Sequence, residues 1–349
     1  MLKADFTDLE LNFSKPSGTS RGVLNHKKSW YLKIWDDTDS SLYGIGECGP
    51  IEGLSLDPPL LMNLKLKELT SNINNYQKVD LIKFPSIQFG LETALLDLTK
   101  GGNKIIFNND FSNGKQPIYI NGLIWMGDKD NMFQQVKSKL EQGFKCLKLK
   151  IGAINFNDEI SIIKKIREQF EKDDLELRLD ANGAFDPISV TKKLKELSKY
   201  SIHSIEQPII PGQYDQMKEL CSSSPIPIAL DEELIPISSL KLKGDLVSFI
   251  NPHYIILKPS LLGGFEKTNE WISIADKYNI GWWITSALES NIGLNAIAQF
   301  TAQFNNDLPQ GLGTGKIYQN NIPSFLEQKG EYLKINKNLN WDDSILTFN

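Results

Sequence analysis

The sequence is poor in the residues that mark several classes of protein. Only three cysteines occur among 349 residues (Cys48, Cys146 and Cys221), and they lack the paired spacing of a zinc site. We therefore expect reduced thiols and a cytoplasmic location. A formal net charge of −5 offers no basic surplus for nucleic acid. No apolar run approaches the roughly 20 residues that cross a bilayer, and acids interrupt the N-terminal segment, which argues against a signal peptide.

The residues that are present divide the chain into two parts with different patterns. In the first part, residues 29–36 (SWYLKIWD) alternate like a strand, and residues 44–55 (GIGECGPIEGLS) are predicted to form a loop. Residues 85–100 begin with proline and then repeat apolar side chains at helical spacing. These signals predict an α+β domain over about residues 1–110.

From about residue 117, short apolar runs alternate with amphipathic helical stretches. The runs include PIYINGLIW, CLKLKIG, ELRLDANG, HSIEQPI, IPIALDE, YIILKPS and GWWITSAL, and LPQGLGTG (308–315) is an irregular last strand. Seven or eight such units favour a closed parallel barrel over an open sheet. The final stretch, 316–349, loses this rhythm, and we expect it to pack back on the N-terminal domain.

Five successive strands of this expected barrel each end in a charged residue. In order they are Lys150, Asp180, Glu206, Asp231 and Lys258, each about one strand–helix unit from the next. Active sites of barrels form at the carboxyl ends of the strands, so we expect these side chains to converge there. Any one of them could be a surface charge or a helix cap, but five in phase point to one site.

The three central members of this set are carboxylates, and three converging carboxylates repel one another unless a cation lies between them. A hard divalent ion such as Mg²⁺ prefers this all-oxygen set. The histidines, His26, His203 and His253, are not placed at these strand ends, so the sequence gives no reason to expect zinc.

The motifs around these residues resemble the muconate-lactonizing branch of the enolase superfamily. The matching stretches are KLK, LDANGAF, IEQP, ALDE and LKPSLLGG, on strands two to six. The resemblance implies an α/β fold: a modified (β/α)7β TIM-type barrel over 111–315, with an α+β capping domain formed by 1–110 and completed by about 316–349. It also implies an enzyme in which Asp180, Glu206 and Asp231 bind Mg²⁺, with Mn²⁺ as a substitute, and Lys150 and Lys258 form the acid/base pair.

Within this branch, residues 16–24, 85–98 and 285–299 are most similar to the dehydratases that convert 2-succinyl-6-hydroxy-2,4-cyclohexadiene-1-carboxylate to 2-succinylbenzoate in menaquinone synthesis. The implied partner is this small carboxylate substrate, without nucleic acid or membrane; the oligomeric state is left open. Lys148 is expected to be a supporting charge beside Lys150. Further candidates for supporting or substrate-binding roles are Asn182, Glu232, Arg21, Gly263, Gly264, Ser286 and Ser290.

Other activities of the superfamily stay open or are disfavoured by single features. An N-succinylamino acid racemase, or an enzyme that does both reactions, would use the same two lysines. Dipeptide epimerases usually carry Asp-x-Asp where this chain has WWITSALES, and mandelate-type enzymes use a histidine base that is missing there. A barrel that has lost catalysis and serves as a binding protein is disfavoured because the lysines and carboxylates are all present.

Overall fold

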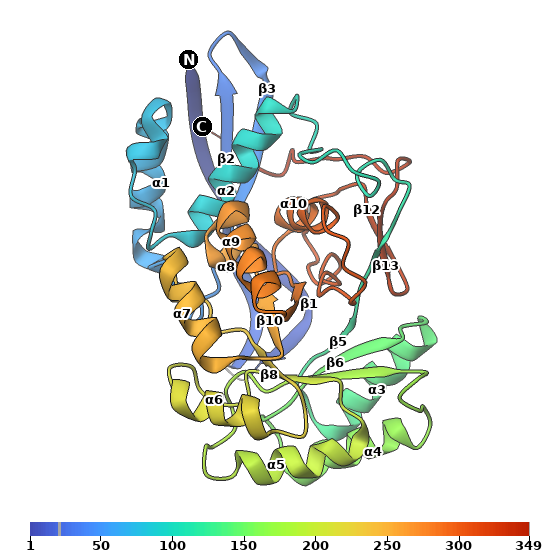
Figure 1. The fold of residues 1–349 in the computed structure, drawn as a ribbon. Helices are drawn as coiled ribbons and strands as arrows, with labels where there is room; N and C mark the ends of the chain where they lie inside the picture. The colour runs from blue at the N-terminus through green and yellow to red at the C-terminus, as the bar shows by residue number, and fades with distance from the viewer. Residues whose placement is uncertain (20–21, 349) are drawn as a thin grey trace.

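The computed structural model describes residues 1–19 and 22–348. An antiparallel sheet with strand order β1-β2-β3 opens the chain, followed by two longer helices (Figure 1). These elements are β1 (Leu2–Thr19), β2 (Gly22–Asp36), β3 (Asp39–Cys48), the short 3-10 helices η1 (Pro59–Leu61) and η2 (Ile73–Lys78), α1 (Met62–Ser71) and α2 (Pro85–Thr99). Helix α2 follows the sequence prediction, with Pro85 at its first turn.

One prediction for this domain was wrong, because residues 44–48 belong to β3 and not to a loop. Gly44 and Gly46 stand here because β3 lies directly against α2. A Cβ on Gly44 would come 1.9 Å from the carbonyl oxygen of Ala94, and one on Gly46 would come 1.9 Å from that of Gly90. The two glycines therefore mark close packing of a strand on a helix and not a turn.

The second part is a curled parallel sheet with helices on its outside. Its strands run in the spatial order β11-β10-β9-β8-β7-β6-β5, so every strand neighbours the next in sequence. Figure 1 shows α3 to α6 covering the side of these strands far from the capping domain. The elements are β4 (Ile118–Tyr119), β5 (Gly122–Ile124), α3 (Lys129–Glu141), β6 (Cys146–Lys150), α4 (Phe156–Arg167), β7 (Glu176–Asp180), α5 (Val190–Leu197), η3 (Ser198–Tyr200), β8 (Ser204–Glu206), α6 (Tyr214–Ser223), β9 (Ile228–Leu230), α7 (Leu240–Ile250), β10 (Tyr254–Leu257), α8 (Pro259–Leu262), α9 (Gly264–Lys277), β11 (Gly281–Ile284) and α10 (Asn291–Thr301).

The barrel closes through the irregular segment that was expected to be its last strand. Gln310 forms a parallel bridge with Ile120, and Gly311 forms one with Thr285. The Gly311 N–H donates to the Ile284 carbonyl at 2.8 Å, and the Ser286 N–H donates to the Gly311 carbonyl at 3.0 Å. These bonds join the two edges of the sheet, and the TIM-type fold expected from the sequence is confirmed.

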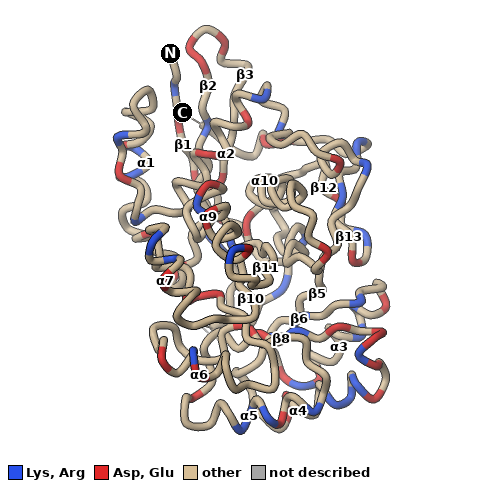
Figure 2. Tube along the Cα trace, in the orientation of Figure 1, with Lys and Arg blue, Asp and Glu red and all other residues tan. Residues whose placement is uncertain are grey.

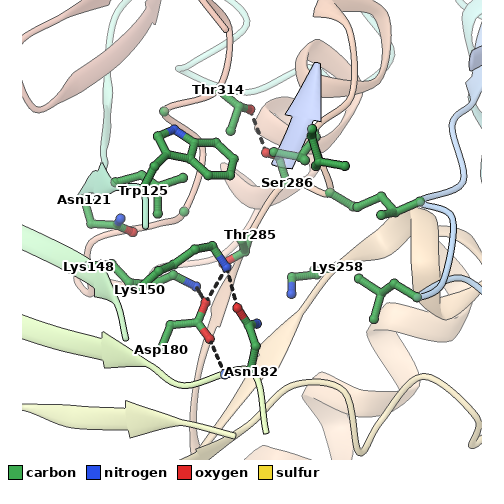
Figure 3. A pocket seen from close by; sticks show the side chains of 18 of the residues that line it. Asn121, Trp125, Lys148, Lys150, Asp180, Asn182, Lys258, Thr285, Ser286 and Thr314 are labelled. Carbon is green, nitrogen blue, oxygen red and sulfur yellow. Dashed lines mark hydrogen bonds and ion pairs between the residues drawn. The ribbon is translucent and has the colours of Figure 1, made fainter. Parts of the chain in front are cut away.

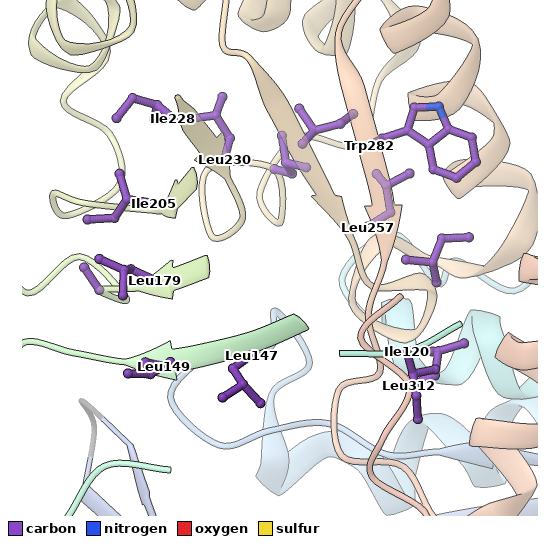
Figure 4. Packing of buried hydrophobic residues seen from close by; sticks show 14 of the residues in the cluster. Ile120, Leu147, Leu149, Leu179, Ile205, Ile228, Leu230, Leu257, Trp282 and Leu312 are labelled. Atoms are coloured by element: carbon purple, nitrogen blue, oxygen red, sulfur yellow. The ribbon is translucent and has the colours of Figure 1, made fainter. Parts of the chain in front are cut away.

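Successive side chains of a strand point to opposite faces, and this separates the apolar core from the charged site. On β6, Leu147 and Leu149 point into the buried apolar layer (Figure 4), while Lys148 and Lys150 project from the opposite face. The outer helices carry interspersed Lys/Arg and Asp/Glu residues (Figure 2). An example is the exposed pair Lys164–Glu168 on α4, at 3.9 Å. Ordinary surface charge thus lies on the helices, and the strand-end charges are separate from it.

The C-terminal stretch contacts both parts of the molecule. Strands β12 (Leu326–Lys329) and β13 (Tyr332–Ile335) form a small antiparallel sheet with β4, in which Leu333 pairs with Ile118. Beyond it, Leu346 packs with Tyr31 and Ile45 of the capping domain. The domain boundaries at residues 110 and 315 stay a prediction. Within the described residues, no helix is long and apolar enough to span a membrane.

Candidate active site

The register of the parallel strands brings the five strand-end residues to one end of the barrel. Lys150 pairs in register with Asp180, and Asp180 pairs with Glu206. Asp231 directly follows β9, and Lys258 follows β10 as the N-cap of α8. Neighbouring strands therefore end level with one another, and the strand-end residues meet at one end of the barrel as their spacing in the sequence predicts.

Each of the three carboxylates is buried and pairs with a lysine. Lys148 Nζ lies 2.9 Å from Asp180 and 2.8 Å from Glu206, and Lys150 Nζ lies 3.1 Å from Asp180. Lys258 pairs with Asp231. Burial by itself would raise the pKa of Asp180, but the neighbouring lysines hold that pKa well below its usual range. Burial and the neighbouring Asp180 raise the pKa of Glu206 to about 8.

A pocket opens above this cluster (Figure 3). Its floor carries the charged and amide groups of the strand ends, and its walls are mainly apolar. The lining residues are Leu24, Ile51, Glu52, Leu54, Asn121, Leu123, Trp125, Lys148, Lys150, Asp180, Asn182, Glu232, Lys258, Thr285, Ser286, Ala287, Leu288, Gly311, Gly313 and Thr314. Charged groups at one end of an otherwise apolar pocket are typical of a site for a small ligand with a polar head.

Asn182 and Glu232 form a hydrogen-bonded chain with the candidate base. Lys150 Nζ donates to Asn182 Oδ1 at 2.8 Å, and Asn182 Nδ2 donates to Glu232 Oε1 at 2.9 Å. Asn182 adopts a left-handed conformation with φ 44°, a region that Asn tolerates better than most residues. The structure thus places Asn182 in contact with Lys150, and Glu232 lies in the pocket wall beyond it.

Several weaker candidates lie elsewhere. Ser290 is not in the pocket; it is the N-cap of α10, and its hydroxyl donates to Glu47 at 2.6 Å. Gly263 lines a different cavity beside α2, and a Cβ on its neighbour Gly264 would come 2.3 Å from the Glu92 carboxylate. Ser286 does line the pocket, although its hydroxyl is hydrogen-bonded to Thr314. Arg21 lies outside the described residues.

Sequence reasoning found the uncharged pocket residues Asn182 and Ser286 but missed others. Asn121 lies between β4 and β5, Trp125 directly follows β5, and Thr285 directly follows β11 (Figure 3). The rule that side chains at the carboxyl ends of strands converge would have found Trp125 and Thr285, because it applies to polar and aromatic residues as well as to charged ones. The apolar wall from the capping domain, which includes Leu24, Ile51 and Leu54, has no such signal.

The donor set at the strand ends matches a hard divalent cation. Asp180, Glu206 and Asp231 offer only carboxylate oxygens, and burial together with the neighbouring carboxylates raises the pKa of Glu206, which a bound cation would lower. In the described part of the chain, no group of three or more His, Cys, Asp or Glu side chains is arranged as a metal site. Here the carboxylates pair instead with the ammonium groups of Lys148, Lys150 and Lys258.

Comparison with known proteins identifies the class to which this fold and site belong. Residues 131–335 match the family model described as enolase C-terminal domain-like, which covers more than half of the chain. The chain therefore belongs to the enolase superfamily, as its motifs suggest.

Individual relatives show which members of this superfamily the chain is similar to. The chain is 44% identical to an o-succinylbenzoate synthase from Desulfotalea psychrophila, over 93% of this chain and 97% of that protein. The crystal structure of MenC from Desulfotalea psychrophila LSv54 matches with a TM-score of 0.87 and 39% identity, covering 96% of this chain and 99% of that one. A muconate lactonizing enzyme from Pseudomonas fluorescens shares the fold, with a TM-score of 0.77 at 19% identity, covering 99% of this chain and 96% of that one.

Proposed function

We propose that the protein is an o-succinylbenzoate synthase, a hydro-lyase that dehydrates 2-succinyl-6-hydroxy-2,4-cyclohexadiene-1-carboxylate to 2-succinylbenzoate in menaquinone synthesis. The observation that carries the proposal is the pair Lys150 and Lys258, which lines one pocket with the strand-end carboxylates beneath it. Similarity to a synthase at 44% identity over nearly the whole chain supports the choice of substrate.

The two lysines take different parts in the proposed reaction. Lys150 removes the proton α to the substrate carboxylate, which leaves an enediolate. Lys258 stays charged beside it and stabilises the new negative charge. Burial opposes a charge on Lys258, but Asp231 and the other acids nearby outweigh burial and raise its pKa. The proton held by Lys150 then passes to the departing hydroxyl, water leaves, and the ring becomes aromatic.

The remaining groups bind and orient the substrate. Asp180, Glu206 and Asp231 would hold Mg²⁺, with Mn²⁺ as a substitute, and the ion would supply positive charge that lowers the cost of forming the enediolate. Asn182 orients Lys150 through the 2.8 Å hydrogen bond. Lys148 favours the ionised form of two of the carboxylates through its contacts with Asp180 and Glu206.

The proposed setting is the cytoplasm, with a small carboxylate as the partner and no role for nucleic acid. All three cysteines are free and buried, which suits a reducing compartment.

An ultraviolet absorbance assay tests the function directly. We expect the purified protein to convert the cyclohexadiene carboxylate to the aromatic product in the presence of Mg²⁺. A parallel assay with N-succinyl amino acids tests the racemase alternative, in which Lys150 and Lys258 would act on the two faces of one α-carbon. Racemisation without dehydration would overturn the proposal, and activity on both substrates would extend it.

A further inference from the structure

The loop that joins β11 to α10 forms one wall of the pocket and contains a strained residue. Residues 285–288 all line the pocket. Leu288 has φ 61°, in the left-handed region that non-glycine residues rarely adopt. Such a conformation costs on the order of 1 kcal/mol or more and persists only when surrounding contacts impose it. The neighbours of Leu288 should therefore reveal what holds the loop.

Two buried donors from outside the barrel strands hold the carbonyl oxygen of Leu288. Lys27 Nζ, on β2 of the capping domain, donates to it at 3.0 Å. The Tyr318 hydroxyl, in the C-terminal stretch, donates to the same oxygen at 2.6 Å. Both donors are buried, so neither bond competes with bulk water.

Both donors are themselves fixed by the capping domain. Lys27 Nζ lies 3.9 Å from Glu47 Oε1 and 3.5 Å from Ser29 Oγ. The Tyr318 ring packs edge-on against Phe13 of β1, with 4.8 Å between the ring centroids. The position of the Leu288 carbonyl therefore depends on the capping sheet.

The residues after Leu288 tie the same loop to the barrel and the cap. Glu289 accepts hydrogen bonds from the Ala287 N–H at 2.8 Å and from the Ser260 hydroxyl, two residues after Lys258. Glu47 accepts from the Ser290 N–H at 3.0 Å, so the capping sheet also holds the start of α10. The loop is thus fixed on both sides of Leu288.

We propose that Lys27 and Tyr318 are positioning residues for substrate recognition, which hold Leu288 in its left-handed conformation so that its side chain completes the apolar pocket wall. Leu24 of β2 and Leu288 pack in one apolar cluster with Tyr318, and both line the pocket. This wall, built jointly by the cap and the barrel, would contact the apolar part of the substrate away from the lysines. The inference rests on the proposed function only for the identity of that substrate.

Tyr318→Phe is the sharpest test, because it removes one donor and keeps the ring against Phe13. We expect KM for the cyclohexadiene substrate to rise about fivefold, with kcat within twofold of the wild type, because the acid/base lysines are untouched. Tyr43→Phe is the matched control, since it also loses a partly buried hydrogen bond, to Asp343 at 2.9 Å, but that bond does not hold the loop from β11 to α10. An unchanged KM in Tyr318→Phe, or an equal rise in Tyr43→Phe, would overturn the proposal.

Leu288→Gly separates positioning from general loss of stability. Glycine adopts a positive φ without a clamp and has no side chain to place. We expect Leu288→Gly to raise KM by itself, and Tyr318→Phe to add no further rise in that background. A further rise of similar size would mean that Tyr318 acts by some route other than Leu288, and the proposal would fail.

Hydrogen exchange separates this inference from the proposed function. In the full-length protein, backbone amides of residues 285–290 should exchange faster in Tyr318→Phe than in the wild type or in Tyr43→Phe. This measurement needs no substrate, so it tests the clamp even if the cyclohexadiene is not turned over. Equal exchange in all three proteins would show that Tyr318 does not hold the loop.

Discussion

Two buried clusters of charge lie in this molecule, and their surroundings differ. The strand-end cluster of Lys148, Lys150 and Lys258 with its three carboxylates borders a pocket. The interdomain cluster of Lys27, Glu47 and Glu289 lies behind the wall of that pocket and contributes no residue to its lining; its carboxylates accept hydrogen bonds from backbone N–H and serine hydroxyl groups. Buried charges are costly without partners in both places. The first cluster keeps groups that a ligand can engage, whereas the second uses its groups to join two parts of the chain.

The largest effect should come from Lys150→Ala. Removing the base should lower kcat at least about 10³-fold, in the range attributed to general acid–base groups, while thermal stability stays near that of the wild type. The measurement is the ultraviolet dehydration assay with Mg²⁺, and exposed Lys164→Ala on α4 is the control. Wild-type turnover in Lys150→Ala would remove the strand-end cluster from the chemistry.

Next in size is the effect of Glu47→Gln on stability. The carboxylate accepts from Ser290 and Gly293 and lies beside Lys27, so the change leaves a buried cation without its anion. We expect a loss of about 3 kcal/mol in the free energy of unfolding, measured with urea. Glu68→Gln removes an exposed pair with Lys65, and its cost should be below about 1 kcal/mol. Equal losses would contradict the structural role of the interdomain cluster.

Magnesium should distinguish the two clusters. At a concentration about 100 times its Kd, Mg²⁺ should stabilise the wild type by about 2.7 kcal/mol, seen as a rise in Tm. Glu47→Gln should keep this increment, because its site lies elsewhere, and Asp231→Asn should lose it. An undiminished increment in Asp231→Asn would exclude Asp231 as a ligand.

The smallest effect concerns Asp57, a buried acid of the capping domain whose carboxylate accepts from Ser86 N and Oγ. Burial raises its pKa from 3.8 to about 6. The folded state therefore binds the proton more tightly, and this contribution to stability is full below pH 4 and lost as the pH rises through 6.

Asp57→Asn stays neutral at every pH and should show no such loss. From pH 4 to pH 7, the free energy of unfolding of the wild type should therefore fall by about 2 kcal/mol relative to Asp57→Asn. Urea unfolding at several pH values measures the difference. A difference that stays constant over this range would show that Asp57 titrates normally in the folded protein.

The two clusters also differ in how far the sequence predicts them. Lys150, Asp180, Glu206, Asp231 and Lys258 are predictable because each strand–helix unit has a similar length, so side chains at equal phase reach the same end of the barrel. The hydrogen bond between Glu47 and Ser290 joins residues 243 apart in sequence. No local period links such residues, so the sequence predicts a supporting or substrate-binding role for Ser290, whereas the structure shows it as the N-cap of α10 held by the capping domain.

Local patterns were also ambiguous where backbone packing decides the conformation. Gly44 and Gly46 suggested a loop, yet their lack of a side chain serves the contact between β3 and α2. The left-handed conformation of Leu288 has no signal in its residue type, since leucine rarely adopts it. Such features depend on tertiary contacts, which override local preference.

The closure of the barrel has a consequence for its local stability. Its last strand is attached by single bridges at Gln310 and Gly311, whereas β6 and β7 pair along five residues. We therefore expect the barrel to open more readily at this seam than between β6 and β7. Thr285, Gly311 and Gly313 lie both at the seam and in the pocket wall, so brief parting of the seam would widen the pocket from its side. This weakly paired part of the barrel thus borders the pocket, so its movement would change the space that a ligand occupies.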